Sequence, residues 1–420
     1  MKPRLLITAS TLPNDPSDPE PRFIVDLARS LDRHFEVCVV APLNPEGTPH
    51  DSSFGVEVRR YRYAPFRAWE TLAYPGAILD RLRENRARWG LVPLLFAGLF
   101  REVRQLNSER NFDCVHAHWM IPQAFVQAVA SGRDRSPPFI AVAQGADIHA
   151  TNGPITRQAV KFAISRASGV ITASDDLRQR LLHRFPGEMA GLPTDVVGTG
   201  VDTDKFSPVR RSEDWPSTLG LSHPLICFFG RLSEKKGVEV LLMAMAREPL
   251  RSLHASVVIV GQGLRGNALR QLAYDLGIND RLRFLPAASH EMLPAYVASS
   301  DVVCVPSVSL HSGDREGRPT VLVEAAACGI ASVASDSGGV GDWIDHGSNG
   351  LLVPQGDATA LSEALAAVLR KPDRLREMGR LARTKALKYS WQAVGDRYAE
   401  LTWRILDRCP SSDSIGHQAR

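Results

Sequence analysis

The sequence contains little of what marks several large classes of protein. Its 420 residues include only six cysteines. Five of these lie in or beside apolar runs, and the six together lack the spacing of a metal-ligand set. We therefore expect buried thiols of a reducing compartment. The formal net charge of +4 is too small to indicate nucleic-acid binding.

Long apolar segments are also scarce. The longest, from Trp89 to Phe100, contains two glycines and a proline and is shorter than a transmembrane helix requires. The first ten residues are charged and only briefly apolar, so we interpret them as a buried strand and not as a signal peptide. These features predict a cytoplasmic protein.

Short β-branched runs alternate with helical patterns along most of the chain, which is typical of parallel sheets covered by helices. The expected strands are 4–8, 36–40, 56–61, 114–116, 139–142, 170–171, 195–197, 225–229, 256–260, 282–285, 302–305, 332–334 and 351–353. With 44% hydrophobic residues, the chain is long enough for two domains. We predict an α/β fold of two doubly wound, Rossmann-like domains, with a hinge near 200–224, where X-Pro pairs interrupt the pattern.

The most informative stretch is the glycine- and charge-rich run 313–320, which leads into a helical pattern. Pro319 and Thr320 are residues that commonly begin helices. The free N–H groups of a helix start favour phosphate oxygens. Glu316 before the helix and Glu324 inside it could accept hydrogen bonds from sugar and ribose hydroxyls. A surface loop before an ordinary capped helix is the alternative.

Two cations follow the strand 225–229. Arg231 and Lys236 leave its carboxyl end, which is where ligands bind in parallel sheets. Fixed positive charges at this place suit a diphosphate. A solvated charged turn is the alternative.

The run from Gly261 to Gly266 has the G-x-G-x-x-G spacing of dinucleotide-binding loops. The acidic residue expected at the end of the next strand is missing, because the strand 282–285 is followed by Pro286. We therefore interpret these glycines as letting the backbone approach a mononucleotide diphosphate.

Taken together, these motifs resemble those of retaining glycosyltransferases of glycosyltransferase family 4, of the bacterial cell-surface polysaccharide type, which have the two-domain GT-B fold. The resemblance covers nearly the whole chain. The matching motifs are Gly200-Val201-Asp202 with Phe206 and Pro208, Phe229-Gly230-Arg231-Leu232, Lys235-Lys236-Gly237, Val260-Gly261-Gln262-Gly263, Glu316-Gly317-Arg318-Pro319, Glu324-Ala325, Asp336 to Gly339, and Asn349 to Val353.

The resemblance implies a nucleotide-diphosphate sugar as donor, retention of the anomeric configuration, and neither cofactor nor metal. It implies an acceptor-binding domain at 1–205, joined by a C-terminal helix at 386–410, and a donor-binding domain at 206–385, the two facing a central cleft. Asp202-x-Asp204 imitates a metal-binding DxD motif, but it belongs to a linker motif of this family, and we interpret it as unrelated to metal binding.

The resemblance also assigns roles to residues. Arg231, Lys236 and Glu316 are the expected catalytic residues, the two cations holding the diphosphate and Glu316 the donor sugar. Glu324 is expected to bind the ribose. The other expected donor-binding residues are Gly230, Gly261, Gly263, Leu285, Ala287, Gly317, Arg318, Pro319 and Thr320.

The first domain departs from the family pattern. The loop after the first strand lacks the glycine pair of many relatives, and Gln144 stands where a related motif often begins with His. Gln144 can still donate hydrogen bonds, but it cannot titrate. We expect His116, His118, Gln144 and Asp147 to line the acceptor side, although a structural role for at least one histidine is an open alternative.

The segment 59–110 carries eleven arginines against five acidic residues, interleaved with aromatic side chains. This combination suits an anionic membrane surface, or a solvated face over a core helix. We expect a glycan or polyprenyl-linked glycan as acceptor and a possible peripheral position at the inner face of the plasma membrane. Two alternatives remain: a dinucleotide-dependent sugar oxidoreductase, and a nucleotide-sugar-binding, epimerase-like relative of the same fold.

Overall fold

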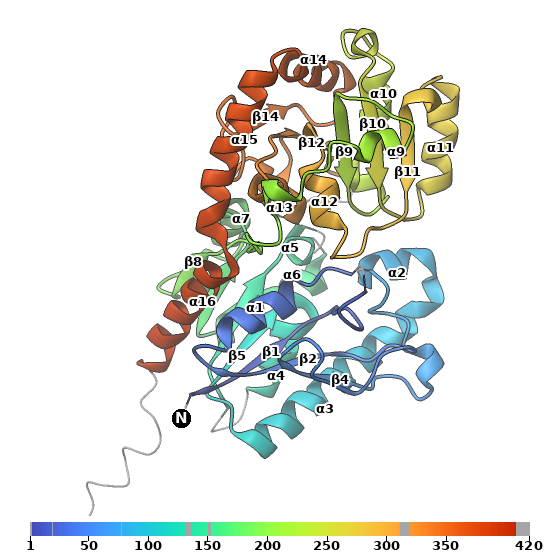
Figure 1. Ribbon diagram of the computed structural model, residues 1–420. Coiled ribbons are helices and arrows are strands. Elements are labelled where there is room, and N and C mark those ends of the chain that lie inside the picture. The colour runs from blue at the N-terminus through green and yellow to red at the C-terminus, as the bar shows by residue number, and fades with distance from the viewer. Residues whose placement is uncertain are drawn as a thin grey trace, which may run out of the picture. The chain divides into compact units, whose positions relative to one another are not determined.

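The computed structural model describes residues 2–18, 20–76, 78–131, 136–149, 153–310 and 319–408. Two compact units divide the chain (Figure 1). The first contains the described residues of Met1–Ala173, Leu177–Val197 and Gln392–Arg420, and the second contains those of Ser174–Asp176 and Gly198–Trp391. Each unit is a sheet with helices on both faces, which confirms the predicted fold class.

The sheet of the first unit has the strand order β3-β4-β2-β1-β5-β6-β7-β8 and is parallel except for the pair β3–β4. Its strands are β1 (Arg4–Thr8), β2 (Glu36–Pro42), β3 (His50–Asp51), β4 (Glu57–Tyr61), β5 (Cys114–His118), β6 (Phe139–Ala143), β7 (Gly169–Thr172) and β8 (Thr194–Val196). Its helices are α1 (Phe23–Leu31), α2 (Ile78–Glu84), α3 (Val92–Arg110), α4 (Phe125–Ala130), α5 (Ala146–His149), α6 (Pro154–Arg166), α7 (Asp175–Arg184), α8 (Pro186–Met189) and α16 (Trp391–Leu406).

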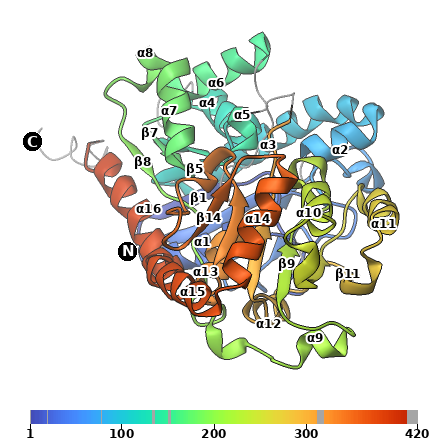
Figure 2. The ribbon, with the colours of Figure 1, turned by 90° about the horizontal axis from the view of Figure 1, so that it is seen from above.

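The second unit is a parallel sheet with the order β11-β10-β9-β12-β13-β14 (Figure 2). Its strands are β9 (Leu225–Phe229), β10 (Ser256–Val260), β11 (Leu282–Leu285), β12 (Val302–Val305), β13 (Ser332–Ser335) and β14 (Gly350–Val353). Its helices are α9 (Trp215–Thr218), α10 (Val238–Met245), α11 (Gly266–Asp275), α12 (Leu293–Ala298), α13 (Thr320–Ala327), α14 (Ala358–Leu369) and α15 (Pro372–Ala386). Strands β9, β10, β12 and β13 are buried along their whole length, as strands covered on both faces must be.

The strand order reverses once in each parallel array, and this reversal marks the place where a ligand crevice forms. In the first unit it falls between β1 and β5, and in the second between β9 and β12. Ligands of open α/β sheets bind at the carboxyl ends of the strands on either side of such a point. The loops after these four strands are therefore the places to look for a site.

The last helix, α16, packs on the first unit although it follows the whole of the second. Arg397 pairs with Asp195 at 2.6 Å, and Asp396 lies 2.8 Å from His34. A Cβ atom on Gly395 would come within 2.5 Å of Ser30 Oγ, so the helix approaches α1 closely at this position. The first unit is thus built from both ends of the chain.

Five cysteines, Cys38, Cys114, Cys227, Cys304 and Cys328, are buried free thiols, as predicted. Burial raises the pKa of Cys38 and Cys227 to about 12, so both thiols stay protonated at neutral pH. Cys409 lies outside the described residues. None of the helices in the described part of the chain has the length and apolar character needed to cross a bilayer.

Candidate functional site

The turn that carries Arg231 and Lys236 follows β9 at the strand-order reversal. Arg231 is exposed and Lys236 is half-buried. The 3₁₀ turn Glu234–Lys236 ends at Gly237, whose φ is +63°. A Cβ atom there would lie 2.0 Å from the Pro306 carbonyl oxygen, so only glycine fits. The turn is thereby fixed against the segment that follows β12, and Val308 N donates to Lys235 O at 2.9 Å.

The glycines after β9 and β10 bring two loops together. Gly230, Gly261 and Gly263 have φ values of +151°, +156° and +158°. A Cβ atom on Gly261 would lie 1.9 Å from the Gly230 oxygen, and one on Gly263 would lie 2.5 Å from the Leu232 oxygen. The close contact between the two loops alone requires glycine at 261 and 263. The approach of a ligand is therefore not needed to explain these glycines. Their contact with a nucleotide stays a prediction.

The segment expected near the nucleotide base continues this row of loops. Gly261 N donates to Leu285 O at 3.1 Å, just as Gly230 N donates to Val260 O at 3.0 Å. Leu285 and Ala287 are both half-buried at the carboxyl end of β11. The loops after β9, β10 and β11 therefore form one continuous hydrogen-bonded edge.

Helix α13 begins at Thr320 with extended Pro319 as its N-cap, and no side chain caps it. Leu322 N donates to Pro319 O at 3.2 Å, so within the helix only the amides of Thr320 and Val321 in its first turn lack an acceptor. Glu324 is half-buried one turn inside the helix and interacts with the protein around it. Glu316, Gly317 and Arg318 lie outside the described residues.

Serine hydroxyls that could not be selected from the sequence lie at the carboxyl ends of β12 and β13. Ser307 and Ser335 are buried, and their Oγ atoms have no hydrogen-bond partner among the described residues. Ser309 Oγ lies 3.2 Å from Ser337 Oγ. A buried hydroxyl without a partner costs free energy, so a hydrogen bond from a ligand or from water would stabilise the hydroxyls of Ser307 and Ser335. Their only sequence signal is their place directly after predicted strands.

In the first unit, His116 is a core residue. Its side chain is fully buried under α16, with Nε2 2.9 Å from Thr402 Oγ1 and its ring 5.7 Å from that of Tyr398. Burial lowers the pKa of His116 to about 3, so the ring is neutral. His116 therefore has a structural role under α16, while its expected contact with an acceptor stays a prediction.

His118 and Gln144 form a pair at the ends of β5 and β6. The Gln144 side-chain nitrogen lies 2.9 Å from His118 Nδ1. Because an amide nitrogen can only donate, Nδ1 accepts and the proton of the neutral ring is on Nε2. His118 is fully buried, and burial together with the neighbouring His116 holds its pKa well below the usual range. Its Nε2 has no partner among the described residues.

Asp147 ties the same two loops together. Its buried carboxylate accepts from the backbone N–H groups of Met120, Gln144 and Gly145 at 2.8, 3.1 and 2.7 Å. Burial raises its pKa although these hydrogen bonds oppose the rise. Trp119, between the loops, has a φ of +77°, a strained value for a large residue. Asp147 therefore positions Gln144, and its expected place on the acceptor side stays a prediction.

A second pair of polar side chains lies at the β1–β5 reversal. Ser10 Oγ donates to Gln123 Oε1 at 2.8 Å, and both residues are buried. The Gln123 amide nitrogen has no partner among the described residues. Neither residue could be selected from the sequence, because nothing local links positions 113 residues apart.

Asp202 acts as a turn residue. Its Oδ1 accepts from the backbone N–H groups of Asp204 and Lys205 at 3.1 and 2.9 Å. This is the local pattern of an Asx turn. Within residues 2–408, gaps excepted, no three His, Cys, Asp or Glu side chains gather as metal ligands do.

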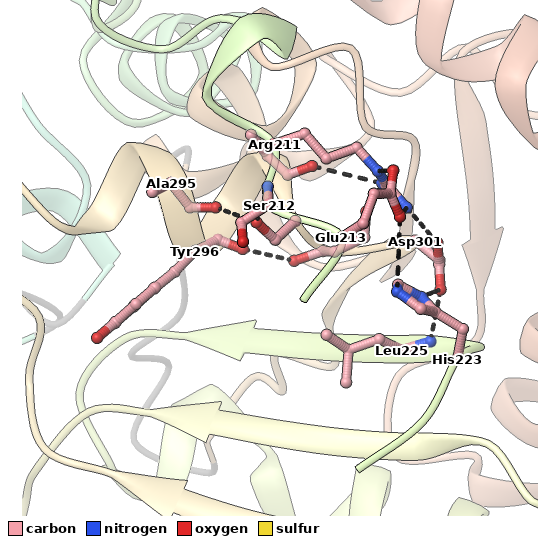
Figure 3. A network of polar contacts seen from close by, with 11 residues as sticks. Arg211, Ser212, Glu213, His223, Leu225, Ala295, Tyr296 and Asp301 are labelled. Carbon is pink, nitrogen blue, oxygen red and sulfur yellow. Dashed lines mark hydrogen bonds and ion pairs between the residues drawn. The ribbon is translucent and has the colours of Figure 1, made fainter. Parts of the chain in front are cut away.

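A network of polar side chains in the second unit lies at the amino ends of the strands (Figure 3). His223 Nδ1 is 2.5 Å from Asp301 Oδ2, and the same carboxylate accepts from Leu225 N at 2.7 Å. Arg211 bridges Asp301 and Glu213. Leu225 is the first residue of β9, so this network anchors the preceding linker at the amino ends of the strands, away from the expected ligand edge.

Comparison with known proteins identifies the family of both halves. Residues 21–205 match the model described as Glycosyltransferase Family 4, and residues 209–385 match that described as Glycosyl transferases group 1. A D-inositol 3-phosphate glycosyltransferase of Nocardia farcinica is 31% identical over 337 residues, which cover 75% of this chain and 72% of that protein. A GDP-mannose-dependent alpha-(1-6)-phosphatidylinositol monomannoside mannosyltransferase of Mycolicibacterium smegmatis is 30% identical, covering 71% and 78%.

Solved structures show the same fold. Sucrose-phosphate synthase from Thermosynechococcus elongatus has a TM-score of 0.76 at 20% identity, covering 97% of this chain and 100% of that chain. HepE from Anabaena, in complex with UDP and glucose, has a TM-score of 0.70 at 21% identity, covering 96% and 99%. With its two α/β units, its ordered motifs and these relatives, the chain belongs to glycosyltransferase family 4 and is a glycosyltransferase with the GT-B fold.

Proposed function

We propose that this glycosyltransferase moves a hexose from a nucleotide-diphosphate sugar to a glycan or polyprenyl-linked glycan in surface polysaccharide biosynthesis, with retention of the anomeric configuration. The observation that carries the donor assignment is the position of Arg231 and Lys236 at the β9–β12 reversal, on a turn fixed against Pro306. Two cations at this place suit a diphosphate, and they would work without a metal.

In the proposed reaction, the bond between the anomeric carbon and the distal phosphate oxygen breaks, and the electron pair stays on that oxygen. The acceptor hydroxyl oxygen forms the new bond to the anomeric carbon, and its proton is released. Arg231 and Lys236 stabilise the charge that develops on the diphosphate. The first amides of α13 bind the distal phosphate, and Glu324 binds the ribose.

The acceptor assignment draws on relatives and on the first unit. The name of the mannosyltransferase relative includes phosphatidylinositol monomannoside, which is a lipid that carries a sugar. Ser10, Gln123 and Gln144, at the carboxyl edge of the first sheet, offer neutral hydrogen-bonding groups that suit sugar hydroxyls. A lipid-linked acceptor would also place the protein peripherally at the inner face of the plasma membrane.

The alternatives are less well supported. The oxidoreductase alternative depends on the G-x-G-x-x-G spacing. Close contact between two loops accounts for two of those glycines. An epimerase-like relative would bind the donor without transfer. Nicotinamide absorbance in the purified protein would favour the first, and donor binding without transfer to any acceptor would favour the second.

The test begins with a thermal-shift screen of nucleotide sugars, because a ligand that binds only the folded state raises its apparent stability. The best donor is then incubated with polyprenyl-linked glycans, and NMR of the product gives the anomeric configuration. We expect retention, and activity that persists in EDTA. An inverted product would refute the retaining mechanism, and a loss in EDTA that only added metal restores would refute metal independence.

A further inference from the structure

Two short 3₁₀ turns of the first unit expose aromatic side chains. Phe66 is 61% exposed and Trp69 52% exposed, at the turn Arg67–Trp69. Trp89 is 58% exposed, in the turn Arg86–Leu91. The Phe66 and Trp69 rings meet edge to face, with centroids 5.1 Å apart. We call residues 66–69 and 86–89 the aromatic turns. Large aromatic rings exposed to water in this way are typical of an interaction surface.

Most arginines of the segment 59–110 are used inside the unit. Those paired with carboxylates are Arg59, Arg62, Arg81, Arg83, Arg88 and Arg110. Arg60 is buried. The basic excess seen in the sequence is therefore largely neutralised by neighbouring carboxylates, and a membrane attachment carried by all eleven arginines does not follow from it.

Each aromatic turn nevertheless keeps one exposed arginine. Arg67 donates to the Gly47 carbonyl, which leaves its charge uncompensated. Arg86 is exposed as well. Neither Arg67 nor Arg86 has a carboxylate within ion-pair distance in the described part of the chain. Each turn thus combines exposed aromatic surface with one available positive charge.

Helix α2 holds the two turns in one arrangement. Arg81 Nε donates to Thr71 O at 3.1 Å, just after the first turn. Arg88, in the second turn, donates to Glu84 at 2.8 Å and to Arg81 O at 3.0 Å. Figure 1 shows α2 at the outer edge of the first unit. Arg81 and Arg88 therefore position the turns and are not free to bind another surface.

We propose that the aromatic turns seat the enzyme in the interface of an anionic lipid bilayer, with Phe66, Trp69 and Trp89 at the headgroup level and Arg67 and Arg86 against lipid phosphates. The inference rests on the proposed lipid-linked acceptor. Tryptophan prefers the membrane–water interface, and arginine beside it adds attraction to anionic lipid. The aromatic rings supply most of the attachment and the two arginines supply its preference for anionic lipid.

The test is flotation of the full-length protein with phosphatidylcholine vesicles that contain phosphatidylglycerol. A triple variant, Phe66→Ser, Trp69→Ser and Trp89→Ser, should lose at least about tenfold in partitioning at any salt concentration. Arg67→Gln with Arg86→Gln should lose about fivefold per arginine at low salt and little at high salt. Tyr274→Ser removes a 71% exposed aromatic residue of the second unit and should float like wild type.

A triple variant that floats like wild type overturns the proposal, and so does equal loss in Tyr274→Ser. A change in oligomeric state without vesicle binding also overturns it, because the turns would then bind a second copy. Release of nucleoside diphosphate with a water-soluble acceptor separates this inference from the proposed function. If the triple variant releases nucleoside diphosphate at the wild-type rate and the wild-type protein does not float, the proposed membrane docking is refuted and the proposed sugar transfer is not.

Discussion

Gln144 supports His118 through a contact of 2.9 Å between its side-chain nitrogen and Nδ1 of the ring. Where relatives often have a titratable histidine, this chain has an amide that fixes the tautomer of a neighbouring one. Two neutral side chains thus occupy the carboxyl edge of β5 and β6.

Replacing Gln144 by Leu should leave His118 Nδ1 buried without a partner. We expect a loss of about 1–3 kcal/mol in the free energy of unfolding, measured by urea titration. Gln105→Leu is the matched control, because the exposed side chain of Gln105 donates to Glu109 on its own helix. Equal effects of the two changes would contradict the buried pairing.

Arg231→Ala and Lys236→Ala should each lower kcat by about 10²–10³ while the melting temperature stays close to that of wild type. The reason is that both cations stand at the strand end expected to hold the leaving diphosphate. Lys235→Ala is the control, since the known contact of Lys235 with Val308 uses its backbone oxygen. Turnover within a few-fold of wild type for both variants would refute the diphosphate assignment.

The two glutamates should separate in binding measurements. Glu324→Gln should weaken binding of the free nucleotide as well as of the donor, because its expected partner is the ribose. Glu316→Gln should spare the free nucleotide and slow sugar transfer. Isothermal titration with the nucleoside diphosphate checks both variants, and the same loss of affinity in each would disprove the division of roles.

His116 should make the protein sensitive to acid. Its pKa is about 3 when folded, against 6.5 for an ordinary histidine. Between these values the unfolded state binds more protons, so stability falls with decreasing pH by up to about 1.4 kcal/mol per pH unit and is unaffected above 6.5. His116→Gln should show a shallower fall in urea titrations between pH 6.5 and 4. An equally shallow fall in the exposed control His183→Gln would count against this explanation.

The sequence predicted the sheets well because buried parallel strands leave uninterrupted β-branched runs. Each of the thirteen expected strands appears, with ends that differ by at most two residues. The strand it missed, β3, is two polar residues long and pairs with β4. A strand this short has no recognisable pattern in the sequence.

The positions of candidate site residues could be predicted where they depend on local sequence order, but not where they depend on distant contacts. Arg231 could be placed because its strand and loop are adjacent in sequence. Gln123 could not, since its partner Ser10 is 113 residues away. His116 was expected at the site because it lies near the carboxyl end of its strand. Its contact with the distant Thr402 shows that α16 covers it.

The return of α16 to the first unit has a consequence for synthesis of the chain. Thr402, which bonds His116, is made 286 residues after it, when the second unit has already been synthesised. Until then α16 does not cover His116 and the face of the sheet around it. The N-terminal half therefore stays incompletely packed while the second unit folds. A stop codon shortly before Trp391 should therefore yield a protein in which the N-terminal unit, and not the truncated end, is the part that proteases attack first.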